Sequence, residues 1–315
     1  MGLKLVAIWR RLPVLVRAPI VAFVVLNVGS ILAVLPIFGN TKFLTSVPWA
    51  LPGTMAIMWA FWLYATGSGY PSATRAYRAT MTRDKTVSAS VWRAAIPAVI
   101  ASLIVTWSLR LVLPSVVPVA PPSLPIDISV YPVTTVIGLA LAIALSAGVV
   151  EEIAFRGYLQ KSLEDAYGIV PALILTGIAF WSAHADKVTV SHLPFHLAVS
   201  VLLGTATYLT RSLLPAMVGH VLGDALLLPA YVYHRPHVAW SLLTARPVWE
   251  GHANATVVDR LHVIVTSVRP SLLLEPSSHP LAVAGWILIV SSIAAVFALR
   301  RLARVAAIAS THRQR

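Results

Sequence analysis

The chain lacks several features on which soluble and secreted proteins depend. It contains no cysteine, which excludes disulfide bonds, a thiolate metal site and a cysteine nucleophile. Only 11% of its 315 residues are charged, against about a quarter in an ordinary soluble domain. A soluble fold of this size could not cover its surface with so few charges, and intrinsic disorder is excluded by the same composition. The apolar side chains must therefore be solvated by lipid.

Apolar residues are abundant: they form 58% of the chain and give a mean hydropathy of +0.81. A membrane-spanning helix needs about 20 mostly apolar residues. We expect transmembrane helices at approximately 18–38, 47–66, 91–113, 132–152, 169–184, 193–210, 213–233 and 280–299. The predicted fold class is therefore an all-α polytopic membrane protein with about eight transmembrane helices.

The net charge of +13 is predicted to reflect membrane topology. If the expected helices alternate in direction, most of the 24 lysines and arginines fall in loops on the side of the N-terminus. An excess of cations is typical of cytoplasmic loops. We therefore expect a multi-pass protein, most simply of the cell membrane, with both termini in the cytoplasm, membrane lipid around it and no nucleic-acid partner. Arg110 lies near a helix end and belongs to neither group of loops.

Ionisable side chains in membrane helices are costly, so each one is a candidate for a functional site. Six of them follow or lie within apolar segments: Glu151, Glu152, Arg156, His184, His220 and Asp224. Residues four apart share a helix face, so Glu152 should lie beside Arg156, and His220 beside Asp224. An arginine beside Glu152 would keep that carboxylate ionised. Glu151 has no such partner on its own helix and is therefore available for proton transfer.

Glu151 and His184 are expected to lie at the same depth in the membrane. The helix that carries Glu151 should continue through Leu163 and break near Gly168, before the chain returns toward His184. This break lies midway between the two residues. Because both arms rise by about 1.5 Å per residue, the two side chains should meet.

Two further histidines and two aromatic residues have simpler interpretations. His192 and His196 have the spacing of a metal-binding pair, but they lie near a helix start without a nearby acidic ligand. We interpret them as histidines of the membrane interface. Phe180 and Trp181 are interpreted as packing and interface residues.

Three motifs of the chain resemble those of a known family. Glu151-Glu-Ile-Ala-Phe-Arg156, Phe180-Trp-Ser-Ala-His184 and His220-Val-Leu-Gly-Asp224 resemble, in order, EExxxR, FxxxH and HxxxN/D. These are motifs of the CPBP family, the CAAX proteases and bacteriocin-processing enzymes, also called the Abi family. The resemblance covers roughly residues 130–233 and implies an intramembrane endopeptidase that cuts a peptide bond near the cytoplasmic side of the membrane.

The resemblance also implies roles for the glutamates. Glu151 would activate a water molecule as the general base, assisted by His184. Glu152 and Arg156 would orient Glu151. The spacing of the charges indicates the same two roles, with Glu152 paired to Arg156 and Glu151 available for proton transfer.

His220 and Asp224 would stabilise the oxyanion of the tetrahedral intermediate. Better-understood CAAX proteases carry Asn at the position of Asp224, and an amide donates a hydrogen bond that an ionised carboxylate cannot donate. Asp224 must therefore be protonated, orient another group or bind a cation. No cofactor is expected, and the alternative is a zinc-dependent protease with Glu151, His184, His220 and Asp224 as ligands.

The predicted organisation has four parts. Residues 1–130 would hold the first three helices with basic cytoplasmic loops, and 131–233 would form the catalytic core of helices four to seven. Residues 234–279 would form an extracytoplasmic loop, and 280–315 the last helix with a basic cytoplasmic tail. The expected partner is a peptide or membrane-protein substrate. This substrate is either lipidated, as in CAAX processing, or of the leader and bacteriocin type. The sequence does not indicate an oligomeric state. The alternative from another class is a non-catalytic immunity or scaffold protein of the membrane.

Overall fold

Helices make up the regular structure in the part of the chain that the computed structural model describes, residues 9, 11–43, 46–83, 87–116, 131–184, 192–233 and 278–311. The longer helices are α2 (Val14–Phe43), α3 (Ala50–Ala65), α5 (Ala89–Val116), α6 (Val133–Glu151), α9 (Leu193–Thr210), α10 (Leu214–Tyr233) and α13 (Ser278–Thr311). The shorter ones are α4 (Arg75–Thr82), η2 (Glu152–Leu159), α7 (Gln160–Tyr167) and α8 (Ile169–Ser182).

Each of the eight predicted spans coincides with one of these helices. Within the described ranges, five segments are long and apolar enough to cross a membrane: Val14–Phe43, Ala89–Leu113, Val133–Tyr167, Leu193–Thr210 and Val283–Thr311. Three further apolar helices are shorter, namely Ala50–Ala65, Ile169–Ser182 and Leu214–Leu226. The predicted all-α polytopic class is confirmed, while the count of eight crossings stays a prediction.

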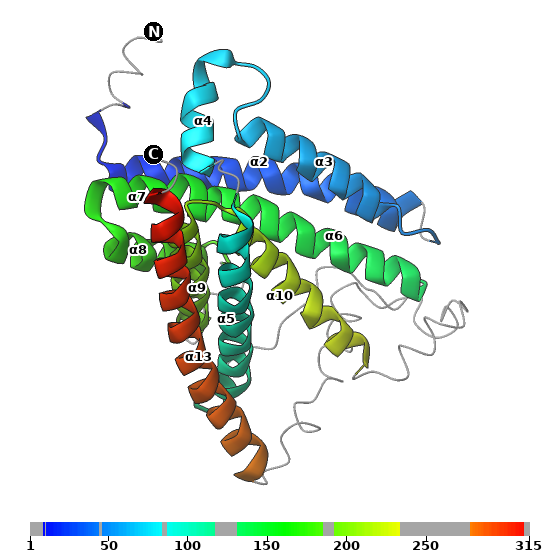
Figure 1. The fold of residues 1–315 in the computed structure, drawn as a ribbon. Helices are drawn as coiled ribbons and strands as arrows, with labels where there is room; N and C mark the ends of the chain where they lie inside the picture. Colours follow the sequence, from blue (N-terminus) through cyan, green and yellow to red (C-terminus); the bar gives the residue numbers. More distant parts are fainter. Residues whose placement is uncertain are drawn as a thin grey trace.

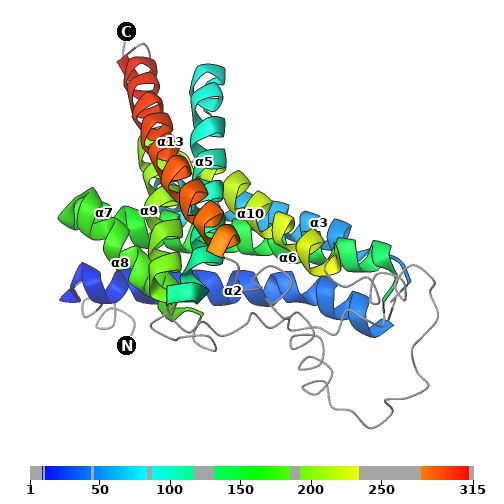
Figure 2. The ribbon, with the colours of Figure 1, turned by 90° about the horizontal axis from the view of Figure 1, so that it is seen from below.

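The helices form two groups that diverge from one end of the molecule (Figure 1). In one group α2, α3 and α6 run side by side, and in the other α5, α9 and α13 do so. The view turned by 90° shows the same separation, with α10 between the groups (Figure 2). Because α10 packs against α6, α9 and α5, it connects the two groups.

Small residues bring α10 close to α6. Ala144, which is fully buried on α6, lies one turn before Gly148 on the same face of the helix. A Cβ atom on Gly148 would clash with the Val221 side chain and lie 3.0 Å from the Val221 backbone nitrogen. Helices in lipid associate through close van der Waals packing, which small residues permit. The ends of α6 and α10 that carry the site residues are therefore held in contact.

The helix that carries Glu151 continues as predicted and changes its winding after that residue. α6 passes directly into η2, a π-helix, and then into α7, which ends at Tyr167. Gly168 has φ +82°, a conformation that glycine adopts without strain, and α8 returns from there. The predicted break at Gly168 is confirmed, whereas the π-helical segment was not expected.

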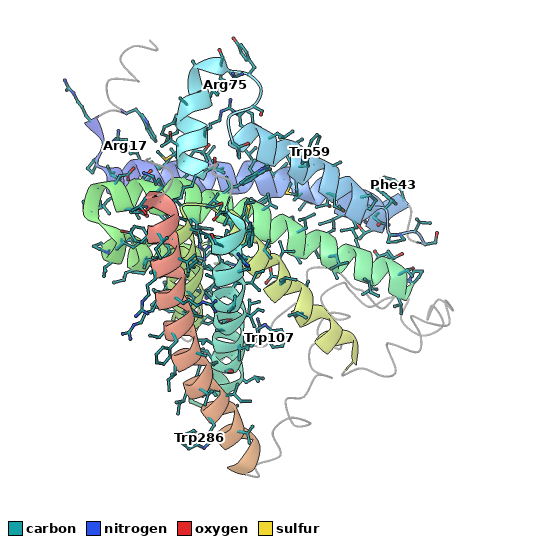
Figure 3. All side chains as sticks on the ribbon, viewed as in Figure 1. Arg17, Phe43, Trp59, Arg75, Trp107 and Trp286 are labelled. Carbon is teal, nitrogen blue, oxygen red and sulfur yellow. The ribbon has the colours of Figure 1, made fainter. Side chains whose placement is uncertain are left out.

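Charged residues gather at the end where the two groups of helices meet. Figure 3 shows Arg17 and Arg75 near α4 at this end, while Phe43 and Trp286 lie at the far ends of α2 and α13. Glu164 on α7 forms ion pairs with Arg83, which follows α4, and with Arg211 in the turn between α9 and α10, the latter at 3.2 Å. This cluster, which we call the Glu164 clamp, connects three segments that are distant in sequence.

The predicted division into four parts stays a prediction. α2 and α3 pack against α6, and α2 also packs against η2, so the predicted parts 1–130 and 131–233 share one core. The predicted loop 234–279 lies almost entirely outside the described residues. The outer face of α13 exposes Trp286, Val290 and Phe297, as expected for a helix in contact with lipid.

Candidate active site

The ring of Phe180 lies at the centre of a polar cluster. Its centroid is 4.9 Å from the ring centroid of His184, 5.5 Å from that of His196 and 6.2 Å from that of His220. The guanidinium of Arg156 lies over the same ring, 4.7 Å from the centroid. A buried phenylalanine on α8 therefore packs against side chains from η2, α9 and α10 and brings them together.

Glu152 is held from two sides. Arg156 Nη1 lies 3.2 Å from Glu152 Oε1, and both side chains are 0% exposed. The Nδ1–H of His220 donates a 2.7 Å hydrogen bond to the same oxygen. The predicted pair of Glu152 and Arg156 is confirmed. Because both neighbours stabilise the ionised carboxylate, Glu152 is suited to orientation rather than to proton transfer.

His220 brings the two glutamates and Asp224 together. A carboxylate oxygen only accepts, so the hydrogen bond to Glu152 assigns a proton to Nδ1 of His220. The other nitrogen, Nε2, lies 3.7 Å from Glu151 Oε2 and 3.7 Å from Asp224 Oδ2. These are ion-pair distances and exceed hydrogen-bond length. The neighbour Asp224 was predicted from the spacing, whereas the contacts with the glutamates link α10 to α6 and η2.

Glu151 has more open surroundings than Glu152. Its side chain is 19% exposed. Within the described ranges, its ion-pair contact is with His220, and His184 lies within electrostatic range. The three residues predicted to carry the chemistry, Glu151, His184 and His220, thus belong to one cluster.

His184 follows the C-terminal end of α8, and the backbone fixes the orientation of its ring. Its Nδ1–H donates a 2.8 Å hydrogen bond to the carbonyl oxygen of Phe180. Nδ1 therefore carries a proton, and in the neutral tautomer with this bond Nε2 carries the lone pair. A neutral imidazole held in this way is able to accept a proton at Nε2.

His196 belongs to the cluster, although the sequence favoured a position at the membrane interface. Its side chain is 8% exposed, its ring centroid lies 4.7 Å from that of His184, and its Nδ1–H donates to the carbonyl oxygen of His192 at 2.8 Å. The spacing of His192 and His196 was a signal for this site. It could not show which face of α9 would be buried.

The described residues do not present a set of metal ligands. Among them, no three His, Asp or Glu side chains are arranged so that they could hold a metal ion. Nδ1 of His220 is engaged by Glu152, and its Nε2 lies 3.7 Å from each of the two carboxylates that were considered as zinc ligands with it, Glu151 and Asp224.

One comparison with known proteins bears on this site. Residues 132–226 match the sequence model of a family described as Type II CAAX prenyl endopeptidase Rce1-like. The matched range extends from the start of α6 into α10 and contains all six predicted site residues. No curated protein and no solved structure matches the chain. The family match supports the resemblance of residues 132–226 to the CPBP family of CAAX-type proteases, and the protein is an integral membrane peptide hydrolase.

Proposed function

We propose that the protein hydrolyses a peptide bond near the cytoplasmic side of the membrane, with water activated by Glu151. The observation that carries this proposal is the difference between two adjacent carboxylates. Glu152 is fully buried and held by Arg156 and His220, whereas Glu151 is partly exposed and has no arginine within ion-pair distance among the described residues. One carboxylate is thus fixed, and the other is available to a substrate.

In the first step, Glu151 removes a proton from water while the water oxygen attacks the carbonyl carbon of the peptide bond. His184 assists by accepting a hydrogen bond from the same water at Nε2, since its Nδ1–H is held by the carbonyl oxygen of Phe180. When the tetrahedral intermediate collapses, the C–N bond breaks and protonated Glu151 returns its proton to the leaving amine.

His220 and Asp224 stabilise the oxyanion of that intermediate. In its doubly protonated form, His220 donates to Glu152 from Nδ1 and to the oxyanion from Nε2. The charge of this imidazolium is balanced by the carboxylate of Glu152, to which its Nδ1–H donates. Asp224 orients Nε2 or, when protonated, donates a second hydrogen bond.

The cytoplasmic side is supported by the arginines near α4, because cytoplasmic loops collect basic residues (Figure 3). The same argument supports a cytoplasmic position for both termini. The matched family is described as acting on CAAX prenyl substrates. We extend this to the present chain as a peptide substrate of the CAAX type, with peptides of the leader or bacteriocin type as the second candidate.

The alternative mechanism is a zinc-dependent one that uses Glu151, His184, His220 and Asp224 as ligands. Metal analysis of the purified protein discriminates between the two mechanisms. The proposal expects substoichiometric zinc and activity that survives chelation. Stoichiometric zinc that is lost in His184→Ala would overturn it.

The main test compares the wild type with Glu151→Gln. The amide cannot act as a base, so peptide cleavage should fall by at least about 100-fold, and the uncleaved substrate should accumulate in membranes. Quantitative proteomics of the membrane peptides measures this. Asp165→Asn is the matched control, because it removes the same charge from a 55% exposed side chain on α7 and should leave cleavage unchanged.

The alternative hypothesis is that the protein is a scaffold or immunity protein that binds a peptide without cutting it. That reading predicts the same peptides in wild-type and Glu151→Gln membranes. An unchanged peptide inventory together with a phenotype that persists in both strains would reject the hydrolase.

A further inference from the structure

Asn27 is a polar side chain on the exposed face of an apolar membrane helix. It lies near the middle of α2, about 20 Å along the helix from Val14 and about 24 Å from Phe43, and its side chain is exposed. A short amide at this depth cannot reach water on either side of a hydrocarbon core about 30 Å thick. Because a polar group in hydrocarbon is costly unless it is hydrogen-bonded, the amide is a candidate for a contact with another molecule.

Only part of the Asn27 amide is used within its own helix. Its Nδ2 donates a 2.7 Å hydrogen bond to the carbonyl oxygen of Phe23, one turn earlier. Among the described residues, no group donates a hydrogen bond to its Oδ1. A side-chain amide has two N–H donors and one acceptor oxygen. Asn27 therefore presents one N–H and one carbonyl oxygen to the surroundings of α2.

The inner face of α2 is occupied by the protein itself. α2 packs against α3, α6 and η2. Ala18 and Ala22 belong to a buried cluster with residues of η2, and a Cβ atom on Gly29 would clash with the side chain of Val150, which precedes Glu151. Figure 2 shows α2 along the lower edge of the group that it forms with α3 and α6. The exposed face that carries Asn27, which we call the outer face, is therefore the one available to a partner.

The outer face carries a groove whose shape suits a second helix. Its volume is about 480 Å³, and it is lined by Pro19, Ile20, Phe23, Val24, Asn27 and Val28. These side chains form two ridges with a spacing of four residues, one of residues 19, 23 and 27 and the other of residues 20, 24 and 28. Helices pack when a ridge of one enters the groove of the other. Since Asn27 ends the first ridge, a helix in this groove would contact its amide.

The exposed residues around Asn27 also have the spacing of a coiled-coil stripe. Exposed side chains recur at alternating steps of four and three residues, at Ile20, Val24, Asn27, Ile31, Val34 and Phe38. A repeat of 3.5 residues keeps one stripe of a helix against a partner helix along its length. A single amide within such a stripe fixes the register of the two helices.

We propose that two copies of the protein form a symmetric dimer in the membrane, in which α2 packs against α2 and the two Asn27 amides hydrogen-bond to each other. All copies have the same topology in the bilayer, so the paired α2 helices are parallel and Asn27 lies at the same depth in both. In a twofold interface each residue meets the same surface of its partner, and an amide is complementary to itself. A lipid tail offers neither the donor nor the acceptor that Asn27 requires. This inference does not depend on the proposed function.

The lack of cysteine allows a direct test by cross-linking. Val24→Cys places one thiol on the outer face of α2, and Val290→Cys places one on α13 at nearly the same exposure, 58% against 61%. A disulfide forms only where the two Cα atoms come within about 7 Å. In liposomes that contain only the full-length protein and lipid, oxidation should yield a covalent dimer of Val24→Cys and none of Val290→Cys. Equal cross-linking of both variants would indicate random collisions and would overturn the dimer.

The role of the amide is tested by substitution of Asn27. Asn27→Leu keeps a side chain of similar shape and removes the hydrogen bonds, so the dissociation constant of the dimer in liposomes should rise about tenfold. Asn27→Gln retains the amide and should stay within about threefold of the wild type. Single-molecule photobleaching over a series of protein-to-lipid ratios measures all three proteins. Monomers at every ratio, or an unchanged dissociation constant in Asn27→Leu, would overturn the proposal, and neither result bears on hydrolysis.

Discussion

Two glutamates that are adjacent in sequence have opposite surroundings at the active site. Adjacent side chains on a helix point about 100° apart, so one motif directs Glu152 into the protein and Glu151 toward a more open region. Glu152 then meets Arg156 on its own helix and His220 from α10. The motif therefore supplies one fixed and one available carboxylate.

Asp224 provides a prediction at the scale of a single residue. Asp224→Asn keeps the shape of the side chain and adds an amide donor, so cleavage should stay within about threefold of the wild type. Asp224→Leu removes both the polar contact with His220 and any donor, and should lower kcat by about 100-fold. The measurement is kcat on a peptide substrate, with expression and unfolding temperature as controls. A loss in Asp224→Asn as large as that in Asp224→Leu would show that the charge itself is required.

The spacing of single residues predicted the local contacts of the site but not those between helices. The pairs of Glu152 with Arg156 and of His220 with Asp224 follow from positions four apart on one helix. The contact of His220 with Glu152 joins residues 68 positions apart, and no local pattern encodes it. The burial of His196 depends on the rotation of α9 about its own axis, and the residues next to His196 in the sequence are apolar and do not specify that rotation.

At the scale of elements, the site depends on the packing of α6 against α10. Glu151 lies at the end of α6 and His220 on α10, so their separation follows the distance between these helices. The apolar segments that form α6 and α10, and the residues near which they begin and end, were predictable from the sequence. The π-helical winding of η2 was not, because π-helices form well under 1% of residues and have no compositional signal.

Gly148 provides a test of this packing. In Gly148→Ala the new methyl group would press on Val221 of α10, including its backbone, and should move the helices apart. We expect kcat to fall by about tenfold or more, because a shift of about 1 Å in catalytic geometry has large effects. Gly285→Ala is the control, since a Cβ atom there meets no atom within 4 Å. Full activity in Gly148→Ala would mean that the site tolerates a wider spacing.

At the scale of the whole molecule, the Glu164 clamp connects the segment after α4 to α7 and to the turn between α9 and α10. Arg83 and Arg211 both adopt left-handed backbone conformations, with φ of 50° and 54°. These conformations are unfavourable for most residues that carry a side chain. Their ion pairs with Glu164 help to hold these positions. Hydropathy predicted the individual helices well because it depends on local composition, but such contacts between distant segments determine how the helices are arranged.

Glu164→Ala should destabilise the folded protein. The pair of Arg83 and Glu164 is buried, and removal of one partner of a buried pair costs about 3 to 5 kcal/mol. Arg211→Ala should cost less than about 1 kcal/mol, because the Arg211 side chain is mostly exposed and solvent screens its charge. Unfolding in detergent, followed by circular dichroism, measures both. Equal effects of the two substitutions would contradict a dominant role for the buried pair.

The short length of α8 has a consequence for the lipid around it. Its 14 residues span about 21 Å, and the 16 residues of α3 about 24 Å, while the hydrocarbon core of a bilayer is about 30 Å thick. A bilayer adapts to such hydrophobic mismatch by thinning locally. Thinner lipid brings the aqueous phase nearer to the end of α8, where His184 lies. Hydrolysis consumes one water molecule per bond, and a short α8 would place His184 nearer to the aqueous phase that supplies this water.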